Sequence, residues 1–341
     1  MLNCSYMTKR GENPYSYVAQ RDTSGHGTLL ASISAGSYAD GYVGVAPGAE
    51  LLVVKLKQSK QYLRDFFLIK DDVPAFEESD IMLALRFLED YAIRLGKPLI
   101  IIFGLGSANG SRTGASPLAE MMENLTKKPN ISVITCMGNE ANNKCHYKGT
   151  VMSALVPDVM EINVDGTGKG FTMEIWADSL DILSVSIESP SGEYVPRIPA
   201  RMGASMEYTF LYEGSTVTVD YQITENVAGM EVIFVRLKTP VEGTWKFYIY
   251  SLTNIKGSYN AWLPLKQFSG QDIYFLKSDP DTTLTVPAAA DGVISVGAYN
   301  HYTGAAYYES GRGYSADGRI KPDFVAPGAG VYGIAPSGGI K

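Results

Sequence analysis

The sequence predicts an α/β protein whose parallel sheet is flanked by helices and interrupted by an inserted antiparallel β sandwich. Two observations carry this prediction. Buried-strand and helix patterns alternate over the first half of the chain, whereas strands with period-two alternation follow one another from about Val159. The first pattern returns near Asp291. We therefore predict a first part of the α/β domain at 1–157, the insert at 158–269 and a second part at 270–341.

The α/β elements are predicted from short apolar runs and from helix boundary signals. Apolar runs of five or six residues are typical of strands that are buried on both faces. Ser79 is predicted to cap a helix that Gly96 and Pro98 end. Strand, helix, strand, helix and strand in succession indicate a parallel sheet with right-handed crossovers. The strands are expected at 51–56 (LLVVKL), 99–103 (LIIIF) and 131–136, and the helices at 79–95 and from Pro117.

The insert is predicted from alternating segments that turn signals separate. Strands spaced roughly ten residues apart, with no helical pattern between them, indicate an antiparallel sandwich. The Tyr and Trp residues of these strands are expected in the core. The segments are FTMEIWA, LSVSIES, TVTVDYQI, EVIFVRL and WKFYIYSL; after the insert, GVISVGAY and RIKPDFVAPG are predicted to be strands of the α/β domain.

Composition and charge exclude several classes of protein. The 341 residues are 45% hydrophobic and 19% charged, which is ordinary for a globular protein. A net charge of -7 gives no basic surface for nucleic acid or anionic membrane. We find no apolar run near 18 residues and no N-terminal signal pattern. The sequence predicts neither nucleic-acid binding nor a membrane span.

The three cysteines do not indicate a set of disulfide bonds. Cys4, Cys136 and Cys145 are an odd number in a large chain, which favours free buried thiols over a Cys136–Cys145 bridge. His146 follows Cys145, but one Cys-His pair without further ligands is a poor zinc site. We predict no cofactor; whether calcium binds is not readable from the residues.

His26 is the first candidate for chemistry. It lies between two glycines in DTSGHGTLLASISAG, at the predicted start of a helix of small residues. The positive end of a helix dipole disfavours the protonated imidazole and leaves it available as a base. From the residues alone, a structural or surface histidine is the stronger alternative.

Longer motifs change that balance. SGHGTLLASISAG, followed by VGVAPGAELLVVKL, resembles the histidine motif of the subtilisin-like serine proteases, the subtilases (peptidase S8). GLG after LIIIF, then TCMGNEANN, then GRIKPDFVAPG, resemble further subtilase segments in the family's order. The resemblance implies a subtilisin-like fold and cleavage of a protein or peptide substrate by Ser/His/Asp acyl transfer.

The resemblance also assigns roles to particular residues. It implies that His26 is the general base and that Asn139 is the oxyanion donor. The segment Gly104, Leu105 and Gly106 would pair with an extended substrate and line the pocket for the residue before the scissile bond. Met137 and Gly138 would complete the substrate-binding set.

Two members of the triad have no matching position. Glu12 and Asp22 are the only acids before His26, and we interpret Asp22 as a loop or capping acid. Ser205, in GASM, lies inside the insert, and Ser337 has no nucleophile motif. We therefore expect an internal fragment, incomplete at both ends, that is inactive alone. Self-association or a complementing polypeptide would cover its incomplete core.

Within the family, the insert resembles the jelly roll of the clostridial germination proteases (Csp-type subtilases). That subgroup implies a bacterial protein, secreted or spore-associated, although the residues themselves leave the compartment open. The alternative function is a non-catalytic pseudoprotease or interaction protein on a subtilase scaffold. Substrate preference and oligomeric state are beyond what the sequence decides.

Overall fold

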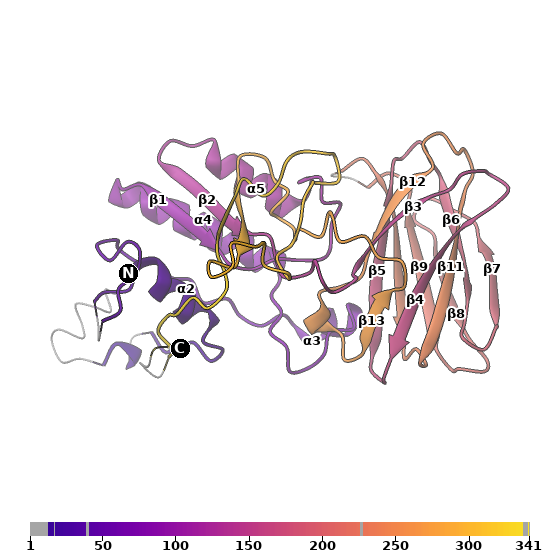
Figure 1. Cartoon of the computed structure of the whole chain (residues 1–341), viewed down its shortest axis with the longest axis horizontal. Helices are drawn as coiled ribbons and strands as arrows, with labels where there is room; N and C mark the ends of the chain where they lie inside the picture. The colour runs from indigo at the N-terminus through magenta and orange to yellow at the C-terminus, as the bar shows by residue number, and fades with distance from the viewer. Residues whose placement is uncertain (1–12, 17, 39–40, 226–227, 337–339, 341) are drawn as a thin grey trace. The chain divides into compact units, whose positions relative to one another are not determined.

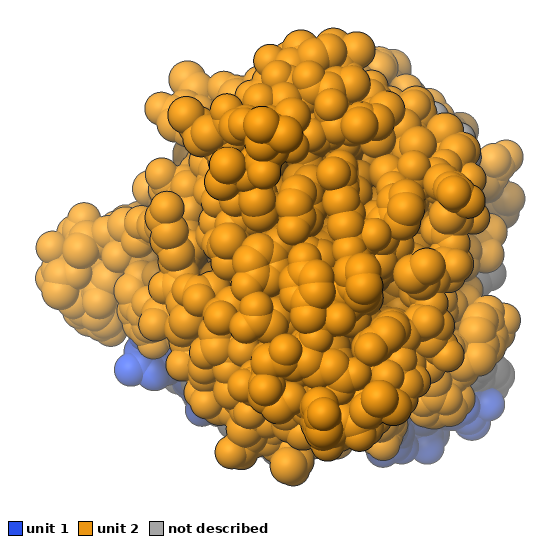
Figure 2. Space-filling view, turned by 90° about the vertical axis from the view of Figure 1, so that its right-hand side faces the viewer, with its two compact units in different colours: residues 1–57, 330–341 blue, residues 58–329 orange. Residues whose placement is uncertain are grey.

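The structure is a computed structural model that describes residues 13–16, 18–38, 41–225, 228–336 and 340. Cys4, Glu12 and Ser337 lie outside the described residues. The chain divides into two compact units, residues 1–57 with 330–341 and residues 58–329. Figure 2 colours the two units separately. Among the described residues, none of the helices combines the length and the apolar composition that crossing a membrane requires.

A four-stranded parallel sheet lies in the larger unit (Figure 1). Its strands β1, β2, β14 and β15 are neighbours in that order, and every pair is parallel. The predicted strands at 99–103 and 131–136, and those in GVISVGAY and RIKPDFVAPG, are confirmed. The bounds are β1 (Leu99–Phe103), β2 (Ile131–Cys136), β14 (Ile294–Tyr299) and β15 (Phe324–Pro327).

Helices α4 (Glu78–Leu95) and α5 (Pro117–Thr126) pack on one face of this sheet through a shared apolar core. Ser116 caps α5, because its hydroxyl accepts the backbone N–H of Ala119 at 3.2 Å. The N-cap residue of α4 is Glu77, which directly precedes the first helical residue, so the predicted cap at Ser79 is wrong. Gly96 ends α4 in a left-handed conformation with φ of 61°, as predicted.

The opposite face of β1 is open among the described residues. Successive strand residues point to opposite faces, and Ile101 and Phe103 join the core under the helices. Ile100 and Ile102 are 64% and 51% exposed. The edge of β1 away from β2 has no partner strand in the described part of the chain.

The predicted strand at Leu51–Leu56 is wrong, because the segment has no regular secondary structure. A strand needs a neighbour that supplies its hydrogen bonds, and no described strand pairs with this segment. Leu51 and Val53 are 56% and 71% exposed. The apolar run therefore lacks the burial that the prediction assumed.

Two antiparallel sheets follow, with a single core made from the inward residues of both. One has the order β3-β12-β5-β10-β9-β8 and the other β13-β4-β11-β6-β7. The five alternating segments are strands, and their two Trp residues, Trp176 and Trp245, are buried. The strands reach from His146 to Phe275, beyond the predicted limits 158–269, which stay a prediction. They are β3 (His146–Thr150), β4 (Asp158–Asp165), β5 (Gly170–Ala177), β6 (Leu183–Glu188), β7 (Tyr194–Ile198), β8 (Ser205–Thr209), β9 (Thr216–Gln222), β10 (Glu231–Lys238), β11 (Gly243–Ser251), β12 (Ser258–Trp262) and β13 (Asp272–Phe275).

Short helices complete the described structure. Helix α3 (Gln61–Phe66) contacts the insert, where the Phe66 ring stacks on Phe234 of β10 with 5.7 Å between centroids. The 3-10 helix η2 (Lys266–Phe268) precedes β13. In the smaller unit, η1 (Pro14–Ser16) precedes α2 (His26–Ala35).

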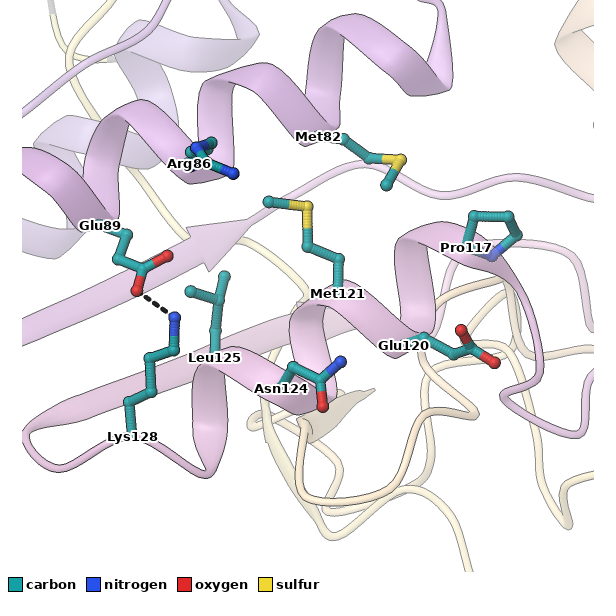
Figure 3. A pocket seen from close by; sticks show the side chains of 9 residues that line it. All are labelled: Met82, Arg86, Glu89, Pro117, Glu120, Met121, Asn124, Leu125 and Lys128. Atoms are coloured by element: carbon teal, nitrogen blue, oxygen red, sulfur yellow. Dashed lines mark hydrogen bonds and ion pairs between the residues drawn. The ribbon is translucent and has the colours of Figure 1, made fainter.

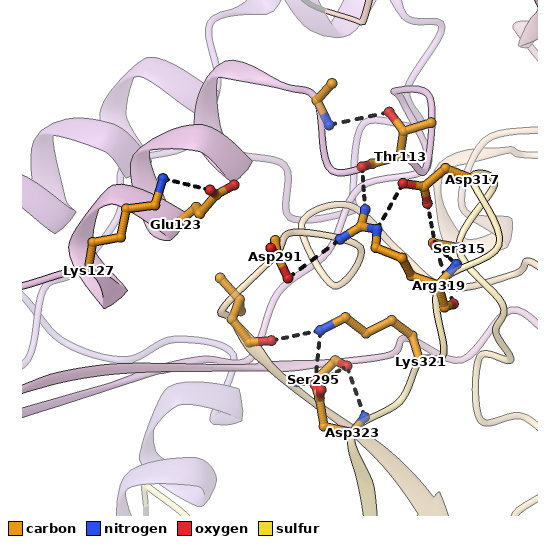
Figure 4. A network of polar contacts seen from close by, with 12 residues as sticks. Thr113, Glu123, Lys127, Asp291, Ser295, Ser315, Asp317, Arg319, Lys321 and Asp323 are labelled. Carbon is orange, nitrogen blue, oxygen red and sulfur yellow. Dashed lines mark hydrogen bonds and ion pairs between the residues drawn. The ribbon is translucent and has the colours of Figure 1, made fainter.

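The KPDFVAPG segment is held to β14 by a compact polar network (Figure 4). Lys321 Nζ donates to the carbonyl of Val293 at 2.9 Å and to the carboxylate of Asp323 at 3.0 Å. The same carboxylate accepts the backbone N–H and the hydroxyl of Ser295. The buried ammonium is thereby paired and hydrogen-bonded, which fixes β15 beside β14.

Candidate active site

Helix α2 begins at His26, as the glycine-flanked motif predicts. Gly25 is its N-cap and has φ of 84°, in the left-handed region that favours glycine. A Cβ atom at Gly25 would lie 3.2 Å from Pro336 Cδ, so a side chain there would also crowd the C-terminal segment. His26 is exposed on the first turn of the helix.

Asp22 holds the first turn of α2 through both carboxylate oxygens. Oδ1 accepts the backbone N–H groups of Ser24 at 3.0 Å and Gly25 at 2.8 Å. Oδ2 accepts the N–H of Thr28 at 2.9 Å and its hydroxyl at 2.7 Å. Partial burial would raise the pKa of Asp22, but these hydrogen bonds outweigh it and lower the pKa well below its usual range. Of the two roles predicted for Asp22, a loop acid or a capping acid, these bonds to the first turn of α2 fit the capping acid.

The segment after KPDFVAPG returns to α2 within the smaller unit. The N–H of Ile334 donates to the Ser32 hydroxyl at 2.8 Å. A Cβ atom at Gly333 would lie 2.4 Å from Leu29 Cδ1. Residues 333–336 therefore lie against the first turns of the histidine helix.

In the larger unit, Asn139 lies just beyond the end of β2. Met137 is buried, and its carbonyl accepts the N–H of Thr285 at 3.0 Å. Gly138 has φ of 84°, which turns the chain out of the strand direction. Asn139 is exposed, and its carbonyl accepts Nδ2 of Asn143 at 3.1 Å. The buried Met137 thus anchors a turn that presents the Asn139 amide at the surface.

Gly104, Leu105 and Gly106 leave the same edge of the sheet as Met137, Gly138 and Asn139. Strands β1 and β2 are parallel, with Phe103 opposite Thr135, so their carboxyl ends meet. The GLG segment is not a strand in this structure. Its backbone continues into Ser107, which exchanges two hydrogen bonds with Val286, at 3.0 and 2.9 Å. The structure brings together these six predicted residues; His26 belongs to the other unit, and its role stays a prediction.

Thr285 is the residue of this region that the sequence analysis missed. Its side chain is buried and lies between two of the predicted glycines. A Cβ atom would lie 2.3 Å from Thr285 Oγ1 if placed on Gly106, and 2.4 Å from Cγ2 if placed on Gly138. The sequence separation from both glycines hides this contact, and TVPAAAD carries no local signal for it.

The two described cysteines are free. Burial raises the pKa of the Cys136 thiol, and it raises that of Cys145 to about 12, with the Glu140 carboxylate adding to the effect. Both groups are therefore protonated near neutral pH and are poor nucleophiles. His146 is buried, stacks on Trp262 and contacts Asn260 through Nε2. No group of three or more His, Cys, Asp or Glu residues that could hold a metal ion occurs among the described residues.

A separate groove of about 390 Å³ lies between α4 and α5 (Figure 3). Met82, Met121 and Leu125 supply apolar surface, and Lys128 pairs with Glu89 at one end. The groove is formed by helices on the covered side of the sheet, and it includes none of the predicted site residues. It is therefore distinct from the edge where Asn139 lies.

Comparisons with known proteins place these features in a family. No curated protein sequence matches the chain significantly. Among solved structures, the chain is similar to one described as the structure of the Clostridium perfringens CspB protease, with a TM-score of 0.82 and 26% sequence identity. The match covers 97% of this chain and 68% of that one. The model of the subtilase family, peptidase S8, matches residues 3–166 and 218–338. The chain, with its mixed α/β subtilisin-like fold, belongs to the subtilase family.

Proposed function

We propose that this chain carries the general base and the oxyanion donor of a subtilisin-like serine endopeptidase. In this proposal His26 accepts the proton of a serine hydroxyl that attacks the scissile carbonyl of a protein substrate. The Asn139 amide then donates a hydrogen bond to the oxygen that becomes negative. The observation that carries the proposal is the shared sheet edge from which Asn139 and the GLG segment emerge.

The geometry of that edge supports substrate pairing by the backbone. Gly104 has no side chain to obstruct an approaching peptide. The missing side chain of Gly106 lets the backbone pack on the buried Thr285, and Ser107 forms a backbone pair with Val286. An extended substrate lying along Gly104–Gly106 would gain hydrogen bonds that do not depend on its sequence. Its scissile carbonyl could then reach Asn139, which is exposed at the end of the neighbouring strand.

We further propose that the serine and the aspartate of the triad lie outside these 341 residues, and that the chain is inactive alone. No G-T-S-x-A sequence occurs in it. Two features support the proposal: the open face and edge of β1, where a further strand could pair, and the position of residues 333–336 against α2. Self-association or a complementing polypeptide would cover that face. We also propose that the two antiparallel sheets form a jelly-roll insert.

The first test uses the 341-residue chain. We expect no hydrolysis of labelled casein and no reaction with a fluorophosphonate probe, because no serine of the 341-residue sequence lies in the nucleophile motif. Stoichiometric labelling that maps to any serine of this chain would contradict the assignment. Active subtilisin serves as the positive control for both reagents.

The second test uses a version extended through the flanking residues of the same gene. We expect casein hydrolysis that His26→Ala abolishes. Asn139→Ala should lower kcat by about 10²–10³-fold, the range known for loss of one oxyanion donor in a subtilisin. Asn124→Ala, on α5, is the matched control and should leave kcat unchanged. An extended version that binds casein but never cleaves it, with other residues at the Ser and Asp positions, would favour the pseudoprotease instead.

A further inference from the structure

The loop that continues the GLG segment carries a buried charge. Arg112 is only 3% exposed and has φ of 55°, an unusual conformation for a residue with a side chain. Its Nη1 donates to the carbonyl of Gly110 at 2.7 Å. A strained backbone and a buried guanidinium are costly, so other groups must hold this loop in place.

The groups that hold it come from the insert. Glu174 of β5 accepts the backbone N–H of Gly110 at 2.7 Å through Oε2, and the same oxygen accepts Nε1 of Trp176 at 2.8 Å. The Arg112 guanidinium lies 4.3 Å from the ring centroid of Trp262. Trp262 belongs to the neighbouring strand β12 and is paired there with Glu174 of β5. One carboxylate and one indole of the insert thus fix both the backbone and the side chain of the loop.

The other side of the loop is held by the segment before β15. The N–H of Ala316 donates to the Arg112 carbonyl at 2.9 Å, and Arg319 Nη2 donates to the carbonyl of Thr113 (Figure 4). At its start, Ser107 is paired with Val286. The loop Ser107–Thr113 is therefore fixed at Ser107 and at Arg112–Thr113, and Glu174 supplies the bond between them, at Gly110.

We propose that Glu174 is a positioning residue for substrate binding, which orders the backbone of residues 104–110 from the insert. This inference rests on the proposed function, in which Gly104–Gly106 pairs with substrate. Without the carboxylate, the Gly110 N–H loses its acceptor, and the Arg112 guanidinium loses the favourable interaction with the Glu174 charge. The backbone that continues the pairing segment would then be less ordered in the free protein, and substrate binding would have to supply part of its ordering.

The test measures hydrogen exchange and polypeptide binding on the 341-residue chain. Glu174→Leu removes both acceptor and charge, whereas Glu174→Gln keeps an acceptor; Glu161→Gln, on a strand of the other sheet, is the matched control. We expect amide exchange at 104–110 to rise at least about tenfold in Glu174→Leu and less in Glu174→Gln. Affinity for fluorescein-labelled β-casein should fall about fivefold in Glu174→Leu, with recovery in Glu174→Gln.

The two readouts separate the inference from the function on which it rests. Exchange at 104–110 equal to wild type in Glu174→Leu would overturn the positioning role. If Glu174→Leu does not fold, Glu174→Ala, which also removes the acceptor and the charge, decides, and an unchanged exchange rate there would overturn it equally. A wild-type chain that does not bind casein would contradict the proposed function, and exchange alone would then show whether Glu174 orders this backbone.

Discussion

In the insert, inward-facing side chains such as Trp245 and Phe247 are fully buried between two sheets, whereas in the parallel sheet Ile100 and Ile102 are half exposed. Parallel sheets are ordinarily covered on both faces, because the crossover helices pack on each side. The insert therefore completes its own core, and the parallel sheet relies on helices for one face only. Stability should depend strongly on the insert core and weakly on the open face.

The largest effect is expected from the insert core. Trp245→Ala should lower the free energy of unfolding by about 3–5 kcal/mol, because it removes a buried ring and leaves a cavity. Ile102→Thr, on the open face, should change it by less than about 0.5 kcal/mol. Urea unfolding of both variants checks the contrast. A cost for Ile102→Thr near that of Trp245→Ala would break the comparison, since it would mean that the face is covered.

A buried carboxyl makes the insert sensitive to pH. Burial raises the pKa of Glu231 from 4.5 to about 8, with the negative charge of Asp181 adding to it and the N–H of Leu183 opposing it. The folded state then binds a proton that the unfolded state releases, so stability should fall as pH rises from about 4.5 to about 8.

Substitution tests this dependence. Glu231→Gln should remove a loss on the order of 3 kcal/mol between pH 5 and pH 8.5, measured by urea unfolding. Glu207→Gln, at an exposed position of β8, is the control and should keep the wild-type profile. An unchanged pH profile in Glu231→Gln would assign the dependence to another group.

At the candidate site, the substitutions that the structure tolerates are limited by how closely the Gly138 backbone approaches Thr285, and not by burial in a core. Gly138→Ala combines a left-handed φ with a Cβ atom 2.4 Å from Thr285 Cγ2, and it should cost about 2–4 kcal/mol. Gly192→Ala has a similar φ of 89° with nothing within 4 Å, and it should cost only about 1–2 kcal/mol. Thr285→Ser removes Cγ2 and should restore part of the difference in thermal unfolding. Equal costs at the two glycines would exclude the contact as the cause.

The smallest effect is expected at the histidine helix. Asp22→Ala should destabilise α2 by about 1 kcal/mol, seen as several-fold faster amide exchange in its first turn. The Asp22 pKa is lowered in the folded state, so its contribution is present above the unfolded value of 3.8 and is lost as the pH falls toward the folded pKa. The variant and the wild type should therefore converge in strong acid. A constant difference at all pH values would show that the carboxylate charge is not responsible.

Local signals explain the elements that the sequence predicted correctly. LIIIF and the helix from Pro117 carry their own boundary residues, and the alternating strands of the insert carry their own period. LLVVKL has the same signal as LIIIF, but a strand also needs a neighbour, which a single sequence does not reveal. The short strands β3 (HYKGT) and β13 (DIYF) escaped prediction because neither carries an apolar run such as that of LIIIF.

The site was predictable only in part for a related reason. Resemblance to subtilase motifs predicts His26 and Asn139 as site residues, and Gly138 is predicted from its place before Asn139. Thr285 and Glu174 act on residues far away in the sequence, at Gly106, Gly138 and Gly110. No local pattern encodes such contacts, because they arise only when the insert and the parallel sheet have both folded.

The ends of the insert bear on the order in which the chain folds. Strands β2 and β14 are neighbours in the sheet, although residues 137–293 lie between them. Where the insert joins the α/β domain, the N–H of Phe275 donates to the carbonyl of Lys144 at 3.0 Å. An insert that folds first would hold these two positions together. Only two short segments would then remain to be closed when β14 pairs with β2, so the entropic cost of that pairing would be lower. During synthesis the sandwich would then act as an internal nucleus for the parallel sheet, whose second half is made last.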